Sequence, residues 1–397
     1  MKIGIDASRA FLKKRTGIEE YSFQVIKNLR EKLKDAQVTL YVRPGEINAS
    51  INSFEIPENW RIKKVNWPRF WTQIGLSIEI LLHPVDVLFI PAHTVPIIHP
   101  SGVGMSKILK LLYGKDRNFR TVVTVHGLEY EFLPEAYSRW ERFYMRLVIK
   151  KSCGWADKII SVSYNTRNDL MELYKIPQDK IEVIYEGCSF YELQVKSKKN
   201  GDNKEQDVLK KYQIKNSKYL LFLGRIEERK NMLGIIKAFA ILKRKYLISH
   251  KLVLAGGFGY RYADIIKYIQ NNDFKDDIYL TGFIDEKDKK EILKNADVFL
   301  FPTLYEGFGL PIIEAQSLGV PIVASNNSSI PEIIGEKGKA TLVNPKNSEE
   351  IAQAVYNILS DKNIRKDLVE PGLENVKRFS WDSCAQGVAR VLLSGQK

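Results

Sequence analysis

Short apolar runs alternate with amphipathic stretches along nearly the whole chain. In the first half, strands are predicted at 2–6, 38–44, 85–92, 120–127, 158–163 and 181–187, and helical periodicity at 17–33, 137–152 and 165–174. Continuous apolar strands separated by helices are typical of a parallel sheet that is covered on both faces. The first half therefore predicts a doubly wound α/β domain.

The same alternation restarts after a charged stretch at 190–217, which has few large apolar residues and indicates a linker or surface excursion. Strands are predicted at 219–224, 251–257, 278–283, 296–303 and 321–325, and helices at 231–245, at 286–296, after Pro311 and from Trp381, which Ser380 can cap. We therefore expect two Rossmann-like domains, 1–188 and 218–378, joined by 189–217 and followed by a last helix within 379–397.

Composition and charge narrow the class of partner. The 397 residues are 44% hydrophobic and 27% charged, with a net charge of +14 and three scattered cysteines. These values indicate a globular protein of a reducing, cytoplasmic compartment, without a signal peptide or membrane span. The positive charge suits nucleic acid, an anionic membrane or phosphate-bearing small molecules, and no nucleic-acid motif is present. Residues 138–151 predict a basic amphipathic helix, which is either an ordinary solvated helix or a membrane-surface helix.

Candidate site residues follow the strands, because ligands of open parallel sheets bind at the carboxyl ends of strands. Gly17 begins the first helix, but the G-x-G-x-x-G fingerprint is absent, which argues against an NAD enzyme. His126 follows strand 120–125 and suits either a structural or a functional role. Gly224 and Arg225 follow strand 219–224, and Lys230 stands at the next helix start. Two cations beside a helix N-terminus predict a diphosphate site, although a solvated charge run remains the alternative.

The segment after strand 296–303 combines glycines with two glutamates. Glu306 opens a loop through Gly307, Phe308 and Gly309, and Glu314 falls in the first or second turn of the following helix. Carboxylates accept hydrogen bonds from sugar or ribose hydroxyls, and backbone N–H groups donate to hydroxyl or phosphate oxygens. The loop therefore predicts a site for a polyhydroxylated ligand. Alternatively, Glu314 only complements the helix dipole.

These motifs together resemble the retaining glycosyltransferases of family 4, which have the GT-B fold. The resemblance rests on EGFGLPIIE at 306–314, on GR and KN at 224–225 and 230–231, and on TGIEEY, FIPAHTVP, VVTVHG and GFID elsewhere. TGIEEY and FIPAHTVP look like mannosyltransferase members that use GDP-mannose. The resemblance implies two Rossmann-like domains facing a central cleft, with the C-terminal helix crossing back onto the N-terminal domain.

The resemblance also implies roles for individual residues. Arg225 and Lys230 would bind the donor diphosphate. Glu306 and the N–H groups of 307–309 would bind the donor sugar, and Glu314 would bind the ribose. His126 would lie beside the sugar, and Gly17 would leave room for diphosphate and acceptor. The implied catalytic set is His126, Arg225, Lys230 and Glu306; the implied donor-binding set is Gly17, Gly224, Phe283, Gly307, Phe308, Gly309, Leu310 and Glu314.

The expected reaction is transfer of a hexose, with mannose favoured, from a GDP- or UDP-sugar to a glycan or lipid-linked hydroxyl, in polysaccharide or glycolipid biosynthesis. The resemblance implies retention of anomeric configuration, no metal and no cofactor beyond the nucleotide-sugar co-substrate. We expect a cytoplasmic enzyme with peripheral contact to the inner membrane face. Two rivals are a glycosidase using Glu306 and Glu314, and a sugar-nucleotide-binding protein without turnover. The chain departs from the family pattern at two positions: it has Gly127 where the family often has Asp, and Glu186 where the family frequently has Asn.

Overall fold

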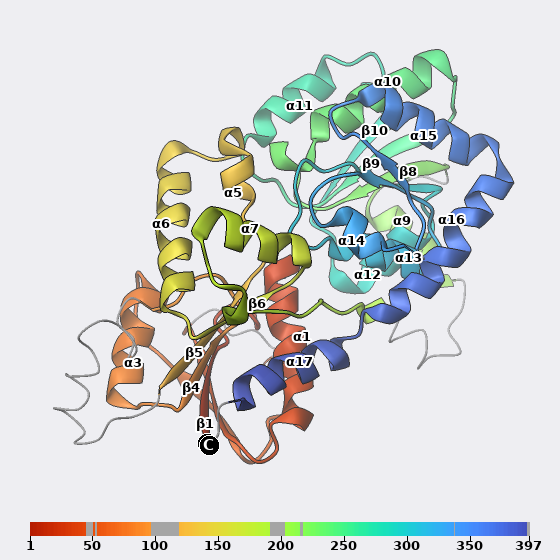
Figure 1. Ribbon diagram of the computed structural model, residues 1–397. Helices are drawn as coiled ribbons and strands as arrows, with labels where there is room; N and C mark the ends of the chain where they lie inside the picture. The colour runs from red at the N-terminus through yellow and green to blue at the C-terminus, as the bar shows by residue number, and fades with distance from the viewer. Residues whose placement is uncertain are drawn as a thin grey trace. The chain divides into compact units, whose positions relative to one another are not determined.

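The chain folds into two compact units, each built around one parallel sheet (Figure 1). A computed structural model describes residues 1–44, 51, 54–96, 119–190, 203–214, 217–336 and 338–394. The first unit comprises Met1–Leu128, Phe143–Gly187 and Trp381–Lys397, and the second comprises Glu129–Arg142 and Cys188–Ser380. The second unit thus includes a short segment from the N-terminal half of the sequence.

The sheet of the first unit has seven parallel strands in the order β3-β2-β1-β4-β5-β6-β7. Its inner strands are buried along nearly their whole length, as expected for a sheet covered on both faces. The strands are β1 (Lys2–Asp6), β2 (Gln37–Val42), β3 (Trp60–Lys64), β4 (Val87–Ile90), β5 (Arg120–Val125), β6 (Lys158–Ser161) and β7 (Ile181–Val183).

Helices connect these strands. Helix α1 begins at Gly17, where the Thr16 and Glu19 side chains form a capping box with each other's backbone N–H groups. The connections are α1 (Gly17–Lys32), the π-helix η1 (Trp71–Leu76), α3 (Ser77–Leu82), α6 (Arg139–Trp155, which begins in the second unit), α7 (Tyr164–Tyr174) and the 3-10 turn η3 (Gln178–Lys180).

The C-terminal helix α17 (Trp381–Leu393) packs on α1 in the first unit, although it follows the second unit in sequence (Figure 1). The rings of Tyr21 and Trp381 meet edge to face at 6.2 Å, and Arg120 Nη2 donates to the Val391 carbonyl at 3.1 Å. The predicted return of this helix to the N-terminal domain is confirmed.

The sheet of the second unit has six parallel strands in the order β10-β9-β8-β11-β12-β13. They are β8 (Tyr219–Leu223), β9 (Lys251–Ala255), β10 (Ile278–Gly282), β11 (Val298–Phe301), β12 (Ile322–Ser325) and β13 (Thr341–Val343). The chain winds from β8 toward one edge and then returns to place β11 on the other side of β8. The two central strands β8 and β11 therefore flank the point where the direction of winding reverses.

Helices and turns flank this second sheet. They are α5 (Glu129–Phe132), η2 (Pro134–Ala136), α9 (Asn203–Lys211), η4 (Glu228–Lys230), α10 (Met232–Lys245), α11 (Tyr262–Gln270), η5 (Lys275–Asp277), α12 (Glu286–Lys294), α13 (Leu310–Ser317), α14 (Ile330–Ile334), α15 (Ser348–Ser360), α16 (Lys362–Asn375) and η6 (Val376–Arg378). Helix α9 lies within the predicted linker, of which residues 191–202 and 215–216 fall outside the described residues.

Candidate functional site

The two central strands of the second unit bring the predicted phosphate and sugar residues together. Strands β8 and β11 are hydrogen-bonded neighbours, with Leu220 opposite Val298. The segment after β8 leads to Lys230, and the segment after β11 leads to Glu306. Ligands of open α/β sheets bind beyond the carboxyl ends of the strands at such a reversal point. The topology thus places both residues where a ligand site is expected.

Glycines allow the ends of β8 and β9 to approach closely. Gly224 and Gly256 have φ angles of +157° and +146°. A Cβ at Gly256 would lie 1.8 Å from the Gly224 carbonyl oxygen, so no other residue fits there. Arg225, which follows, is exposed. The exposed Arg225 side chain thus directly follows the point where the two strand ends approach each other.

Asn231 fixes the turn η4 against the neighbouring strand ends. Its backbone is left-handed, with φ 60°, and its Nδ2 donates to the carbonyls of Pro302 at 2.8 Å and Pro345 at 2.6 Å. The Leu304 N–H also donates to the Arg229 carbonyl at 3.1 Å. Both arginine and lysine of η4 are thereby held against the segment that carries Glu306.

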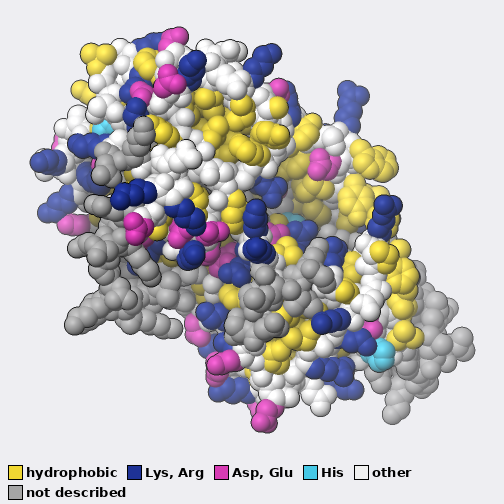
Figure 2. Space-filling view, turned by 180° about the vertical axis from the view of Figure 1, so that it is seen from behind, with side chains coloured by type: hydrophobic (Ala, Val, Ile, Leu, Met, Phe, Trp, Pro, Cys, Tyr) yellow, Lys and Arg dark blue, Asp and Glu magenta, His cyan; other side chains and the backbone are white. Residues whose placement is uncertain are grey.

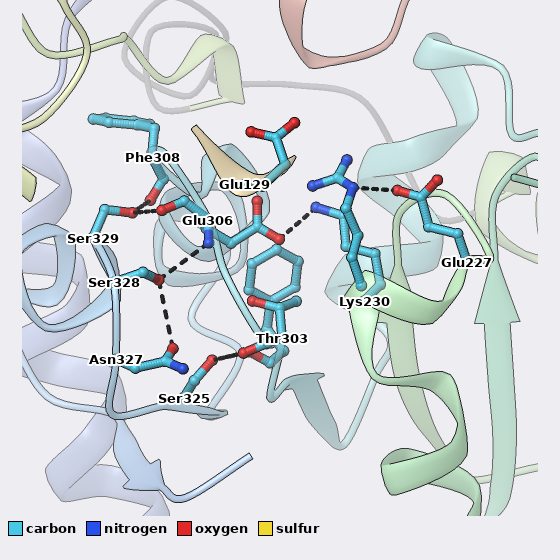
Figure 3. Close-up of polar contacts among 12 residues, drawn as sticks. Glu129, Glu227, Lys230, Thr303, Glu306, Phe308, Ser325, Asn327, Ser328 and Ser329 are labelled. Carbon is cyan, nitrogen blue, oxygen red and sulfur yellow. Dashed lines mark hydrogen bonds and ion pairs between the residues drawn. The ribbon is translucent and has the colours of Figure 1, made fainter. Parts of the chain in front are cut away.

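Lys230 and Glu306 form a buried ion pair (Figure 3). Each side chain is 10% exposed. Hydroxyl groups hold the backbone around Glu306: its N–H donates to Ser328 Oγ at 3.1 Å, and Ser329 Oγ donates to the Glu306 and Phe308 carbonyls at 3.0 and 2.8 Å. The carboxylate is thus presented by a loop whose shape is fixed by hydrogen bonds.

Burial lowers the pKa of Lys230, and the positive charge of Arg229 lowers it further, while the Glu306 carboxylate opposes both. Arg229 itself lies beside Glu227, with Nε and Oε1 2.5 Å apart. Burial works against the charge of Arg229 too, but the carboxylates of Glu227, Glu129 and Glu306 together raise its pKa. Two adjacent cations and three carboxylates therefore share one partly dehydrated cluster.

Glu314 lies away from this cluster, in the second turn of α13 (Leu310–Ser317), and is buried at 6% exposure. Lys289 of α12 donates from Nζ to its Oε1 at 2.5 Å. The two glutamates thus pair with different lysines. Gly309, with φ +111°, precedes α13, and Pro311 occupies its first turn as predicted.

The other residues of the second unit that were predicted to bind the sugar donor lie after β10 and between β11 and α13. Phe283 directly follows β10 and is half-buried. The Phe308 ring packs edge to face on Phe379, 5.7 Å away, and residues 307–309 are all buried. Leu310 is the first residue of α13.

Gly17 and His126 belong to the first unit. A Cβ at Gly17 would meet no atom of the described residues within 4 Å, so packing in this part of the protein does not require glycine there. The ring nitrogens of His126 contact Glu186 Oε1 at 3.2 Å and the Pro91 carbonyl at 2.9 Å. Glu186, one of the departures from the family pattern, is thus a direct neighbour of the predicted histidine.

Sequence reasoning missed several neighbours of the site. Ser328 and Ser329 contact Glu306, and Lys289 contacts Glu314. Arg229 and Glu227, which pair with each other, lie just before Lys230 in the chain. The sequence around Lys289 is EKDKKE, in which nothing distinguishes this lysine from the adjacent ones. The serines could have been noticed because Ser328 and Ser329 follow shortly after the end of the buried strand β12 at Ser325.

Two general features of the site concern metals and membranes. Within the described ranges, no three or more His, Cys, Asp or Glu side chains gather closely enough to hold a metal ion. Among the helices in that same part of the chain, none combines the length and apolar character needed to cross a bilayer.

Comparisons with known proteins identify the family. Residues 15–189 match the family model for Glycosyltransferase Family 4, and residues 204–374 match that for Glycosyl transferases group 1. O-antigen chain mannosyltransferase B of Escherichia coli is 30% identical over 265 residues, which are 67% of this chain and 68% of that protein. O-antigen chain mannosyltransferase RfbU of Salmonella typhimurium is 23% identical over 270 residues, 68% of each chain.

Structural comparison agrees with this match. The crystal structure of HepE from Anabaena in complex with UDP and glucose superposes with a TM-score of 0.71 over 99% of both chains, at 17% identity. That level of identity supports the fold, while the sequence matches establish the family. The chain belongs to glycosyltransferase family 4 and has the GT-B fold.

Proposed function

We propose that this glycosyltransferase moves mannose from a GDP-sugar, with a UDP-sugar as the alternative donor, to a hydroxyl of a glycan or lipid-linked acceptor in polysaccharide biosynthesis. The observation that carries the proposal is the buried Lys230–Glu306 pair at the reversal point of the second sheet. The names of the two O-antigen mannosyltransferases support mannose as the sugar. Transfer retains the anomeric configuration and needs no metal.

The proposed donor lies along the carboxyl edge of the second sheet. Lys230 and the exposed Arg225 bind the diphosphate and stabilise the charge that develops on the leaving nucleotide. Glu306 and the backbone of 307–309 bind the sugar, and Glu314 accepts from the ribose hydroxyls. These cationic side chains neutralise phosphate charge, which a divalent metal ion does in other phosphate sites.

In the first unit, His126 and Gly17 are the proposed ligand-contacting residues. The leaving phosphate oxygen takes the proton of the acceptor hydroxyl on the same face of the sugar, so no enzymic nucleophile is required. Since a Cβ at Gly17 meets no described atom, Gly17→Ala should fold normally and lose activity only if a ligand occupies that space.

The pairing of the glutamates argues against the glycosidase rival. A glycosidase needs one carboxyl group that is protonated near neutral pH and a second that acts as base or nucleophile. Glu306 pairs with Lys230 and Glu314 pairs with Lys289, so the two carboxyl groups belong to separate ion pairs. They do not form the facing pair of carboxyl groups that a glycosidase needs.

A peripheral membrane position is part of the proposal. Four hydrophobic side chains at steps of four residues are exposed beside β4 of the first unit: Phe70, Ile74, Ile78 and Leu82, with Phe70 64% and Leu82 62% exposed. Helix α6 of the same unit exposes Phe143 and Leu147 together with basic residues. Figure 2 shows hydrophobic side chains standing among Lys and Arg side chains. Such a surface suits an anionic bilayer.

Sedimentation with vesicles of anionic phospholipid tests this position. The protein should sediment with the vesicles at low salt and be released at high salt. Phe70→Asp should reduce binding, whereas Leu247→Asp, at an 81% exposed position of the second unit, should not. Equal binding by both variants, or no binding at low salt, would remove the membrane from the proposal.

Thermal-shift measurements with GDP-, UDP- and ADP-sugars test the donor. A ligand that binds only the folded protein raises the midpoint temperature of unfolding, and the rise grows with the logarithm of the ligand concentration divided by its Kd. GDP-mannose should give the largest shift, and a transfer assay with that donor should yield product of retained configuration. Hydrolysis of aryl mannosides without nucleotide would instead favour a glycosidase. Binding of the donor with neither transfer nor donor hydrolysis would favour a binding protein.

A further inference from the structure

The Lys230–Glu306 pair raises a question about the proposed donor site. Lys230 is expected to bind the diphosphate, yet its ammonium group is already paired with Glu306, and both groups are buried. If Lys230 moved to the diphosphate, a buried carboxylate would lose its counter-ion. Removing one partner of a buried ion pair is costly, because the remaining charge is left without compensation. The site therefore needs a second counter-ion for Glu306.

Arg229 has the position and the chemistry for this task. It is adjacent to Lys230 in η4, and Glu306 is one of the carboxylates whose charge raises its pKa. A guanidinium carries five N–H donors in a planar fork, and the contact with Glu227 involves Nε. Its backbone is fixed by the bond from the Leu304 N–H, two residues before Glu306.

A second carboxylate, from a distant part of the sequence, acts electrostatically on Arg229. Glu129, in the short segment that belongs to the second unit, also acts on the charge of Arg229, and the Tyr137 hydroxyl donates to Glu129 Oε1 at 3.2 Å. Stacking of Phe132 on Tyr305, with ring centroids 4.9 Å apart, holds this segment beside the residue that precedes Glu306. Figure 3 shows the carboxylate of Glu306 facing the head of Lys230, with the carboxylates of Glu129 and Glu227 nearby.

We propose that Arg229 is a positioning residue that takes over Glu306 when Lys230 turns to the donor diphosphate. No covalent bond changes in this exchange, and both cations stay protonated. Glu306 stays paired and oriented, so it can accept hydrogen bonds from the donor sugar. The inference rests on the proposed diphosphate role of Lys230, and it deepens that role by naming the residue that makes the ammonium available.

Calorimetric titration of the full chain with GDP, and with UDP in parallel, tests the exchange. Arg229→Met should weaken binding of the nucleotide that the wild type prefers by roughly 10- to 100-fold, because Glu306 then lacks the arginine that would compensate it once Lys230 turns away.

The decisive measurement is a double-mutant cycle. Glu306→Gln removes the carboxylate, so it should tighten nucleotide binding by freeing Lys230. In that background, adding Arg229→Met should change affinity by no more than about 3-fold, because there is no carboxylate left to compensate. Arg244→Met, which removes an exposed arginine paired with Asp273 elsewhere in the unit, is the matched control for loss of one positive charge.

The outcomes separate the two proposals. Failure of the wild type to bind either nucleotide would overturn the diphosphate site and the exchange together. Normal wild-type binding with an unchanged Arg229→Met, or with an equal penalty in the Glu306→Gln background, would overturn the exchange alone. Arg229→Gln carries the same predictions and replaces the methionine variant if thermal unfolding shows that the latter does not fold.

Discussion

Replacing Lys230 by methionine should separate the structural from the catalytic role of its ammonium group. The two side chains of the Lys230–Glu306 pair are each 10% exposed, and breaking a buried pair costs about 3–5 kcal/mol when the remaining charge has no other partner. The charge of Arg229 still acts on Glu306 and offsets part of this loss. We therefore expect Lys230→Met to lower the free energy of unfolding by about 2–3 kcal/mol.

The catalytic effect should be larger and independent of stability. Loss of a cation that stabilises the leaving diphosphate should reduce turnover at saturating donor by roughly 10²–10³-fold. In the double variant Lys230→Met/Glu306→Gln no buried charge is left unpaired, so stability should return to within about 1 kcal/mol of the wild type while turnover stays low.

Urea denaturation and a donor-transfer assay measure the two effects separately. Lys245→Met is the matched control, because Lys245 and Glu349 are 60% and 66% exposed and such pairs contribute little. If Lys230→Met kept turnover within about 3-fold of the wild type under saturating donor, the diphosphate role would be wrong. If the double variant were as unstable as the single one, the cost would not come from the unpaired Glu306.

Three further predictions concern other parts of the molecule. Asn231→Ala should lower the free energy of unfolding by about 2–3 kcal/mol in urea denaturation, because it removes two hydrogen bonds to carbonyls and leaves a residue with a Cβ at φ 60°; Asn231→Gly should cost less, since glycine adopts that conformation freely. Glu314→Gln should raise the donor KM about tenfold with little change in kcat, because a ribose contact is made equally in ground and transition states; an equal fall in kcat and kcat/KM would instead place Glu314 at the reacting centre. Burial raises the pKa of Cys153 to about 12, so its thiol should resist iodoacetamide at pH 8 in the native protein and react after unfolding, as mass spectrometry can follow; rapid labelling of the native protein would contradict the burial of this residue.

The central strands and their order of alternation could be predicted from the sequence, because buried parallel strands read as continuous apolar runs. The edge strands β7 and β10 were predicted as well, but the edge strands β3 and β13 were not. Strand β3 (WRIKK) has one buried residue and the rest partly or fully exposed, so its pattern does not differ from that of a loop. Strand β13 has only three residues. Helices α15 and α16 were also not predicted, although Asn347 caps the first of them by accepting from the Glu350 N–H.

Most site residues were predicted because they follow strand ends or match the family resemblance. The sequence did not predict which lysine pairs with each glutamate. Sequence position indicates that Lys230 and Glu306 lie at strand ends, and the adjacency of β8 and β11 brings them together. That adjacency depends on the whole winding of the sheet, which no local pattern encodes. For the same reason, nothing near Glu129 indicates that it lies in the second unit with Arg229.

The different partners of the two glutamates explain why seven residues separate them. Glu306 lies in the loop before α13, where Ser328 and Ser329 fix the backbone, and it meets a lysine from the segment after β8. Glu314 lies inside the helix and meets Lys289 from the segment after β10. Strands β8 and β10 are separated by β9, so the two ion pairs mark different points along one edge of the sheet. A ligand that reaches both must be extended, with one polar group at each pair, which is the form of a nucleotide sugar rather than of a single glycosidic bond.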